Sequence, residues 1–228
     1  HIGPRAYATS PVTTAAPPSR SPADRLQPPA MSTPAETLAA QTLEVLARVG
    51  THLGPALTEA RLLELEREHA VRIPAELRAL LSVAVPLAEG FTPWGDDDES
   101  CARRVDAFSW PEVGVLFDVE HNAFWLDAWG PRPAETPAAI ARARRHMSSV
   151  PALVPVYGHR YLACEPELVG SPVLSVYQTD VILYGADLAD WARCEFEKAP
   201  IPATTERCAT PFWRDVIDGG ARLSATQG

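Results

Sequence analysis

Four polar side chains could supply an acid/base pair or a mononuclear metal site: Glu120, His121, His159 and Asp180. Carboxylates and imidazoles are the usual general acids, general bases and zinc ligands. The spacing argues against both roles, because the chain has no H-E-x-x-H motif, and Glu120 and His121, as neighbours on a predicted strand, would point to opposite faces. We therefore predict buried structural roles, satisfied by backbone groups and arginines, for five residues: Glu120, Arg132, His159, Arg160 and Asp180.

A serine-nucleophile triad is a second catalytic arrangement that the residue types allow. Its members would be Ser175, His159 and Asp180. Ser175, however, lies in an apolar pattern typical of a strand, and no G-x-S-x-G elbow surrounds it. We therefore expect no catalytic residue, no cofactor and no metal site.

An uninterrupted acidic run, Asp96-Asp97-Asp98-Glu99, lies in a predicted loop over 90–100. The run lacks the glycine and the alternating ligands of a calcium-binding loop. A solvated acidic loop of this kind can contact a basic partner. Most of the six tryptophans should be buried, but Trp94 lies beside this run, and we predict that Trp94 and the run together form a partner-binding patch.

The overall charge favours a basic protein partner. The chain has 228 residues with 20 basic and 29 acidic side chains, a formal net charge of −9. Such a chain repels phosphate, so nucleic acid is not an expected partner. No run of 18 apolar residues and no secretory signal occur, and the four cysteines form no C-x-x-C pair. We expect a cytoplasmic protein with reduced thiols and no membrane partner.

Helices are predicted before strands along the chain. Thr33, Pro34 and Glu36 form a capping box that begins a helix ending near residue 54. Apolar spacing and turn residues predict five further helices, over 58–69, 74–81, 134–147, 187–197 and 212–217, the last ending at Gly219-Gly220. Period-two alternation predicts strands over 113–119, 153–157, 173–177 and 181–184, with Pro155 at an edge or a bulge.

This order predicts an α+β fold, in which N-terminal helices precede a single mixed, largely antiparallel sheet that packs against helices. Seven of the 23 prolines fall before Met31, in a stretch with few large aliphatic residues. We therefore expect a disordered extension over 1–31, one domain over 32–218 and a flexible tail over 219–228.

The order of segments resembles the SUKH superfamily, which contains bacterial toxin-immunity proteins and fungal cell-wall-synthesis regulators. The helical entry of that family is similar to residues 57–81. One bacterial branch is similar to further segments between residues 57 and 218: 110–111, 114–120, 124–125, 129–133, 154–162, 170–182, 184–185 and 187–188. The resemblance implies an α+β binding domain without a cofactor, and it supplies no catalytic residue.

Three hypotheses follow for function. The first is a non-enzymatic immunity protein that binds a cationic polymorphic toxin. The second is a regulatory or scaffold module for an endogenous protein partner. The third is a hydrolase, with or without a metal, that uses Glu120, His121, His159 and Asp180. The sequence determines neither the oligomeric state nor which surface binds.

Overall fold

The computed structural model describes residues 32–163, 169–201 and 211–226, with side chains described up to residue 219 in the last range. The extension predicted over 1–31 lies outside these residues. The N-terminal half holds α1 (Pro34–Arg48), β1 (Leu53–Gly54), α2 (Glu59–Glu68), α3 (Ala75–Leu81), β2 (Val85–Pro86) and α4 (Asp98–His121). A 3-10 turn, η2 (Asp127–Trp129), and α5 (Thr136–Met147) follow. The remaining elements are β3 (Leu153–Tyr157), β4 (Arg160–Ala163), β5 (Val173–Tyr177), β6 (Asp180–Gly185), α6 (Leu188–Glu197) and α7 (Pro211–Thr226).

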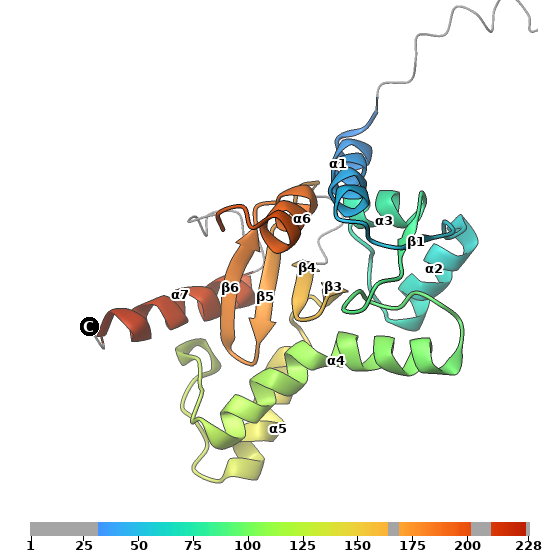
Figure 1. Cartoon of the computed structure of the whole chain (residues 1–228). Helices are drawn as coiled ribbons and strands as arrows, with labels where there is room; N and C mark the ends of the chain where they lie inside the picture. Colours follow the sequence, from blue (N-terminus) through green and yellow to red (C-terminus); the bar gives the residue numbers. More distant parts are fainter. Residues whose placement is uncertain (1–31, 164–168, 202–210, 227–228) are drawn as a thin grey trace, which may run out of the picture. The chain divides into compact units, whose positions relative to one another are not determined.

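The predicted α+β class is confirmed. Strands β3, β4, β5 and β6 form a sheet in chain order in which every pair is antiparallel (Figure 1). Pro155 lies on the edge strand β3, beside a register shift between Pro155 and Tyr157, as the sequence predicts. The hydrophobic pattern did not predict strand β4 or the two-stranded β1–β2 ribbon. Each of these strands has too few residues to show a clear apolar–polar alternation.

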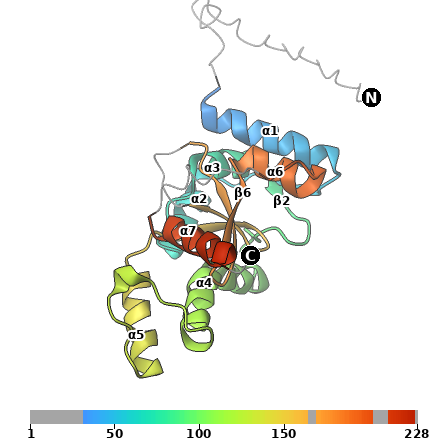
Figure 2. The same ribbon diagram turned by 90° about the vertical axis from the view of Figure 1, so that its left-hand side faces the viewer.

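The two faces of the four-stranded sheet serve two separate cores, as the strict alternation of strand residues dictates. Val154, Leu162 and Val173 face a core shared with α1, α2, α3 and α6. Leu153, Tyr161, Leu174 and others face a second core shared with α4, α5 and α7. Figure 2 shows α1 lying beside α6, and α4 beside α5. The candidate functional site lies on the same side of the sheet as the second core.

Three helices begin where the sequence places their caps. Thr33 and Glu36 form the predicted capping box of α1. Thr58 caps α2 and Asp187 caps α6, each accepting a hydrogen bond from a backbone N–H three residues later. Each cap accepts a hydrogen bond from a backbone N–H of the first turn that has no partner within the helix. The start of each helix could therefore be predicted from a few neighbouring residues.

The strand predicted over 113–119 is wrong, because these residues lie in α4. Val115 and Val119 are buried, whereas Val113 and Phe117 are exposed. The apparent period of two therefore arises from two helical i, i+4 pairs, one on the buried face and one on the exposed face. Glu120 and His121 consequently share the last turn of a helix rather than opposite faces of a strand.

Helix α4 contains Pro111, and Figure 1 shows the helix changing direction along its length. Proline has no N–H, so the carbonyl of Ala107, four residues earlier, lacks its usual helical partner. The hydroxyl of Tyr161 on β4 donates a hydrogen bond of 2.9 Å to that carbonyl. Burial raises the pKa of Tyr161, so its hydroxyl keeps the proton that this contact needs. The interior proline is thus matched by a donor from the sheet.

The predicted end of the last helix is also wrong. Helix α7 begins at Pro211 and continues through Gly219 and Gly220 to Thr226. Glycine in a helix costs about 1 kcal/mol relative to alanine but does not remove a hydrogen bond as proline does, so a Gly-Gly pair is a weak stop signal. The domain boundary at 218 and most of the tail predicted over 219–228 therefore fall inside a helix. No helix in the described ranges is both long and apolar enough to cross a membrane.

Candidate functional site: an acidic pocket beside α4

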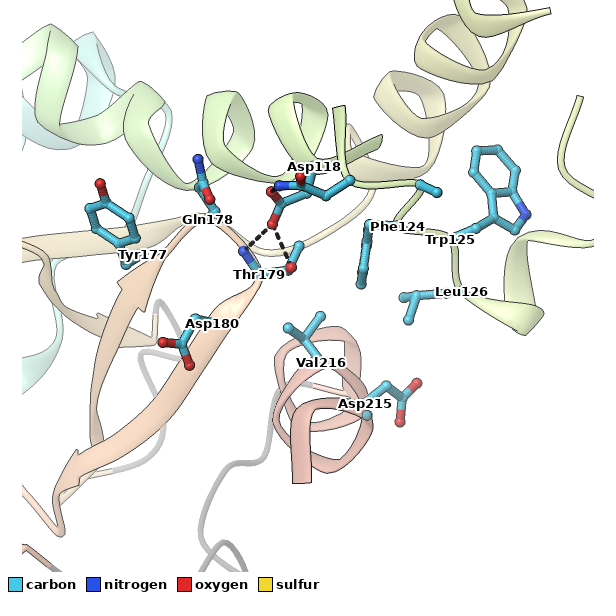
Figure 3. Close-up of a pocket in the computed structure, with 13 residues that line it drawn as sticks. Asp118, Phe124, Trp125, Leu126, Tyr177, Gln178, Thr179, Asp180, Asp215 and Val216 are labelled. Carbon is cyan, nitrogen blue, oxygen red and sulfur yellow. Dashed lines mark hydrogen bonds between the residues drawn. The ribbon is translucent and has the colours of Figure 1, made fainter. Parts of the chain in front are cut away.

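A pocket of about 730 Å³ opens between the end of α4, the segment after it, the β5–β6 turn and α7. Figure 3 shows Phe124, Leu126 and Val216 around its middle, with Asp180 and Asp215 at its edges. We call it the acidic pocket. Its described lining consists of Asp118, Asn122, Ala123, Phe124, Trp125, Leu126, Tyr177, Gln178, Thr179, Asp180, Asp215, Val216 and Gly219.

Asp118 fixes the β5–β6 turn onto α4. Its buried carboxylate accepts hydrogen bonds from the backbone N–H of Thr179, at 2.9 Å, and from the Thr179 hydroxyl, at 2.5 Å (Figure 3). The other carboxylate oxygen accepts from the side-chain amide of Asn122 at 2.6 Å. Charge-assisted hydrogen bonds of this kind are short and strong. Asp118 is therefore a structural wall of the pocket rather than a free acid.

The turn also approaches the helix closely at Gly114. A Cβ atom at this position would lie 2.8 Å from the Cα of Gln178, which is backbone and cannot move aside cheaply. Gln178 itself has a φ of 57°, as tight two-residue hairpins require. Glycine at 114 thus allows the contact that brings Thr179 within reach of Asp118.

The rest of the pocket carries negative charge that no described lining residue offsets. Asp180 and Asp215 are exposed, and an adjoining hollow of about 290 Å³ adds Asp127 and Asp218. None of the described residues lining either space is Arg, Lys or His. Carboxylates beside low-dielectric aromatic walls focus a negative potential, so this pocket attracts cations.

The residues considered for acid/base or metal chemistry are not brought into one site. Glu120 and His121 are exposed at the end of α4, with 3.6 Å between Oε2 and Nε2. His159 is exposed in the β3–β4 turn, where its ring packs against Tyr177, and Asp180 is exposed at the start of β6. No group of three or more His, Cys, Asp or Glu residues in the described part is placed to hold a metal ion. The predicted burial of Glu120, His159 and Asp180 is wrong, because the helix and two turns leave their side chains in solvent.

Ser175 and Arg160 hold the sheet to α6. The guanidinium of Arg160 donates to the Ser175 hydroxyl at 3.0 Å and to the Glu195 carboxylate at 3.0 Å, and it lies over the Tyr184 ring. The hydroxyl of Ser175 is buried on this side of the sheet. These contacts fit the predicted structural role of Arg160, and Ser175 belongs to the same hydrogen-bond network.

Arg132 contacts both α4 and the pocket wall. Its guanidinium donates to the carbonyl of Val119 at 2.8 Å and lies 6.0 Å from the centre of the Trp125 ring. These contacts fit the predicted structural role. They hold the segment after α4, which carries Phe124 and Trp125, against the end of that helix.

The predicted partner patch at the acidic run is largely used within the fold. Asp97 is the N-cap of α4, and hydrogen bonds from the side chain and backbone of Ser100 lower the pKa of its carboxyl group. Asp96 lies 2.7 Å from Nε of Arg61 on α2. Asp98 and Glu99 are exposed in the first turn of α4, where negative charge favours the helix dipole.

Trp94 does not belong to a surface patch. It is only 4% exposed and packs in the core shared with α1, α3 and α6. The exposed tryptophan is instead Trp110 on α4. Trp110, Val113 and Phe117 recur at helical spacing, and that period would have identified an exposed face if 113–119 had been read as helix.

The acidic pocket itself was missed, because its parts are far apart in the sequence. Asp118 and Thr179 are separated by 61 residues, and Asp215 lies on a later helix. Only Asp180 was singled out from the sequence. No local motif links these residues.

Comparison of the chain with models of protein families, with curated proteins and with solved structures found no match.

Proposed function

We propose that the chain is a non-enzymatic protein-binding domain whose acidic pocket receives a basic segment of a protein partner. The single observation that carries the proposal is the placement of Asp180 and Asp215 at a pocket whose described lining includes no basic side chain. In its most specific form, the proposal is that the protein acts in the cytoplasm as an immunity protein that neutralises a cationic toxin domain.

The physical support is electrostatic. Opposite charge across an interface speeds encounter and excludes like-charged partners, and the chain as a whole carries −9. The pocket combines these carboxylates with the rings of Phe124, Trp125 and Tyr177. Aromatic side chains bury a large area at little entropic cost, which is why they anchor protein interfaces.

The support for an immunity role is the resemblance of the segments between 57 and 218 to the SUKH superfamily. Within that resemblance, residues 114–120 correspond to the part of α4 that carries Asp118, and residues 170–182 include the turn that Asp118 holds. A binding role needs both segments only as a rigid support for exposed side chains. No reaction step is required of them.

The test is to mix the purified protein with the products of the genes next to its own at low ionic strength. We expect one basic product to form a complex that weakens as salt is raised, and co-expression with this protein to restore growth of cells that produce that product. A complex without growth rescue would support binding but contradict immunity. If no neighbouring product bound at low ionic strength, the binding proposal itself would be wrong.

A further inference from the structure

A second pocket, of about 300 Å³, shares Tyr177 with the acidic pocket. Its described lining is Asp106, Ala107, Trp110, Gly158, His159, Tyr161 and Tyr177. We call it the aromatic pocket. Two of its rings are unusually open for such large side chains, with Trp110 43% exposed and Tyr177 55% exposed. Large exposed rings around a hollow are typical of a contact site.

The aromatic pocket lies where Pro111 interrupts the hydrogen bonding of α4. Ala107, whose carbonyl the proline leaves open, and Tyr161, which donates to it, both line the pocket. Tyr161 thus replaces the missing helical hydrogen bond from the sheet side, while Trp110, the residue before the proline, remains half exposed. The shape of the pocket follows from the bend and is built into the fold.

The walls of the aromatic pocket are held in place. The indole N–H of Trp110 donates to the carbonyl of Val176 at 3.3 Å, and the N–H of Val176 donates to the carbonyl of His159 at 2.8 Å. The ring centroid of Tyr177 lies 6.2 Å from that of Trp110 and 6.2 Å from that of His159. Fixed rings lose little freedom when a ligand binds, so the site is preorganised.

The charges at the aromatic pocket favour a cation. Asp106 is exposed and is the one carboxylate among the described lining residues. The one titratable base there is His159, whose pKa is lowered by desolvation and by the neighbouring Arg160, both of which disfavour the charged form of its ring. Aromatic faces attract cations, and the planar guanidinium of arginine also stacks on them.

Neighbouring side chains indicate that the occupant belongs to a protein. Val113 and Phe117 extend from Trp110 along the exposed face of α4, at 56% and 44% exposure. Tyr177 lines both the aromatic pocket and the acidic pocket, so the two pockets share this side chain as a wall. A free small cation would use only the hollow, whereas a protein surface would also cover these apolar side chains.

We infer that the aromatic pocket receives an arginine side chain of the basic protein partner, with its guanidinium against the exposed parts of the Trp110 and Tyr177 rings and near Asp106. This inference rests on the proposed function and specifies how the partner is recognised. The arginine anchors the contact, and the acidic pocket meets further positive charge beside it.

The test uses N-acetyl-arginine amide as the probe and needs no partner. The full chain is labelled with ¹⁵N, and the indole signal of Trp110 is assigned by its loss in Trp110→Phe. We expect a saturable shift of that signal with the arginine probe and a much smaller shift with the uncharged N-acetyl-citrulline amide. Asp106→Asn should weaken binding about threefold, and Tyr177→Leu about fivefold. Glu120→Gln, an exposed charge change on the same helix outside both pockets, should leave binding unchanged.

Three results would overturn the inference. Equal shifts with the citrulline probe would mean an apolar anchor rather than a cation. A shift confined to the Trp125 indole and removed by Asp180→Asn with Asp215→Asn would place the cation in the acidic pocket. The absence of any shift would show that the aromatic pocket does not bind the side chain. In each case the complex with a neighbouring gene product, measured separately, would still decide the proposed function.

Discussion

Two acidic regions of the molecule differ in how much of their charge the fold uses. In the run Asp96–Glu99, Asp97 caps α4 and Asp96 pairs with Arg61. At the acidic pocket, Asp118 is used in the same way, but the carboxylates of Asp180 and Asp215 make no hydrogen bond or ion pair with the described residues and line a hollow. A run of like charge in the sequence therefore says little about where charge remains available to a partner.

The two regions are also held in place by different groups. The segment before α4 is held by Arg104, a buried arginine that donates hydrogen bonds to the carbonyls of Pro93 and Gly95. The acidic pocket is held by Asp118 and by the close approach at Gly114. In both regions a buried charged group organises a turn. Only the second leaves exposed carboxylates around a cavity.

The largest effect is expected from Arg104→Ala. The change leaves the carbonyls of Pro93 and Gly95 without their donor and removes the hydrogen bond from Nε to the His69 ring, at 3.2 Å. We expect the free energy of unfolding to fall by about 3 kcal/mol, as for other buried charged groups whose partners are left unpaired. Urea unfolding measures it, and Arg103→Ala, an exposed neighbour, is the control. A loss no larger than that of the control would contradict a structural role for this region.

A smaller effect is expected from Asp118→Ala. It removes the two hydrogen bonds that hold Thr179 and the one to Asn122. Hydrogen bonds to charged groups contribute roughly 1.5–3 kcal/mol, so we expect a loss of about 2 kcal/mol together with weaker partner binding. Glu120→Ala, exposed on the same helix, should change neither. If folded Asp118→Ala protein bound the partner as tightly as the unchanged protein, the β5–β6 turn held by Asp118 would not be needed for binding.

Asp97→Ala should lower stability less than Asp118→Ala, because its carboxylate is exposed to solvent. The lowered pKa of this group means that its contribution is present above its ordinary value of 3.8 and is lost as pH falls through the shifted value. Urea unfolding from pH 6 to pH 3 should therefore show a difference from Asp97→Ala that shrinks on acidification. A difference in the free energy of unfolding that did not change between pH 6 and pH 3 would contradict a contribution from the ionised carboxylate of Asp97.

The smallest effect on stability is expected from the double change Asp180→Asn and Asp215→Asn. Both side chains are exposed and bond to no described residue, so the free energy of unfolding should stay within about 0.5 kcal/mol of the unchanged protein. Thermal unfolding checks this. A large loss would mean that these carboxylates support the fold, as those of Asp96 and Asp97 do, and the contrast between the two regions would disappear.

The sequence predicted what depends on local chemistry. Caps such as Thr33, Thr58 and Asp187, and the strands over 153–157 and 173–177, follow from short-range patterns, and the structure confirms them. The prediction failed over 113–119, where the apolar residues fit both a strand and a helix, and at Trp94, which lies beside acidic residues but is buried. Nothing in the neighbouring sequence contradicts either prediction, because only packing against other elements decides which face is covered.

The site could be predicted only in part. Asp180 was singled out, but its partners in the acidic pocket come from α4 and α7, and pairing across such distances leaves no signal in a single sequence. The exposed aromatic face of α4 was hidden by the same misassignment of 113–119. Correct assignment of that segment would have brought Trp110, Val113 and Phe117 onto one helical stripe.

The most direct test of the central claim compares two pairs of charge changes in the complex with the basic partner. Asp180→Asn with Asp215→Asn removes two charges from the acidic pocket, whereas Asp98→Asn with Glu99→Gln removes two exposed charges from the acidic run. Calorimetric titration at low ionic strength should show about tenfold weaker binding for the first pair, or about 1.4 kcal/mol, and little change for the second. The reverse order, or equal losses in both pairs, would contradict a binding site at the acidic pocket.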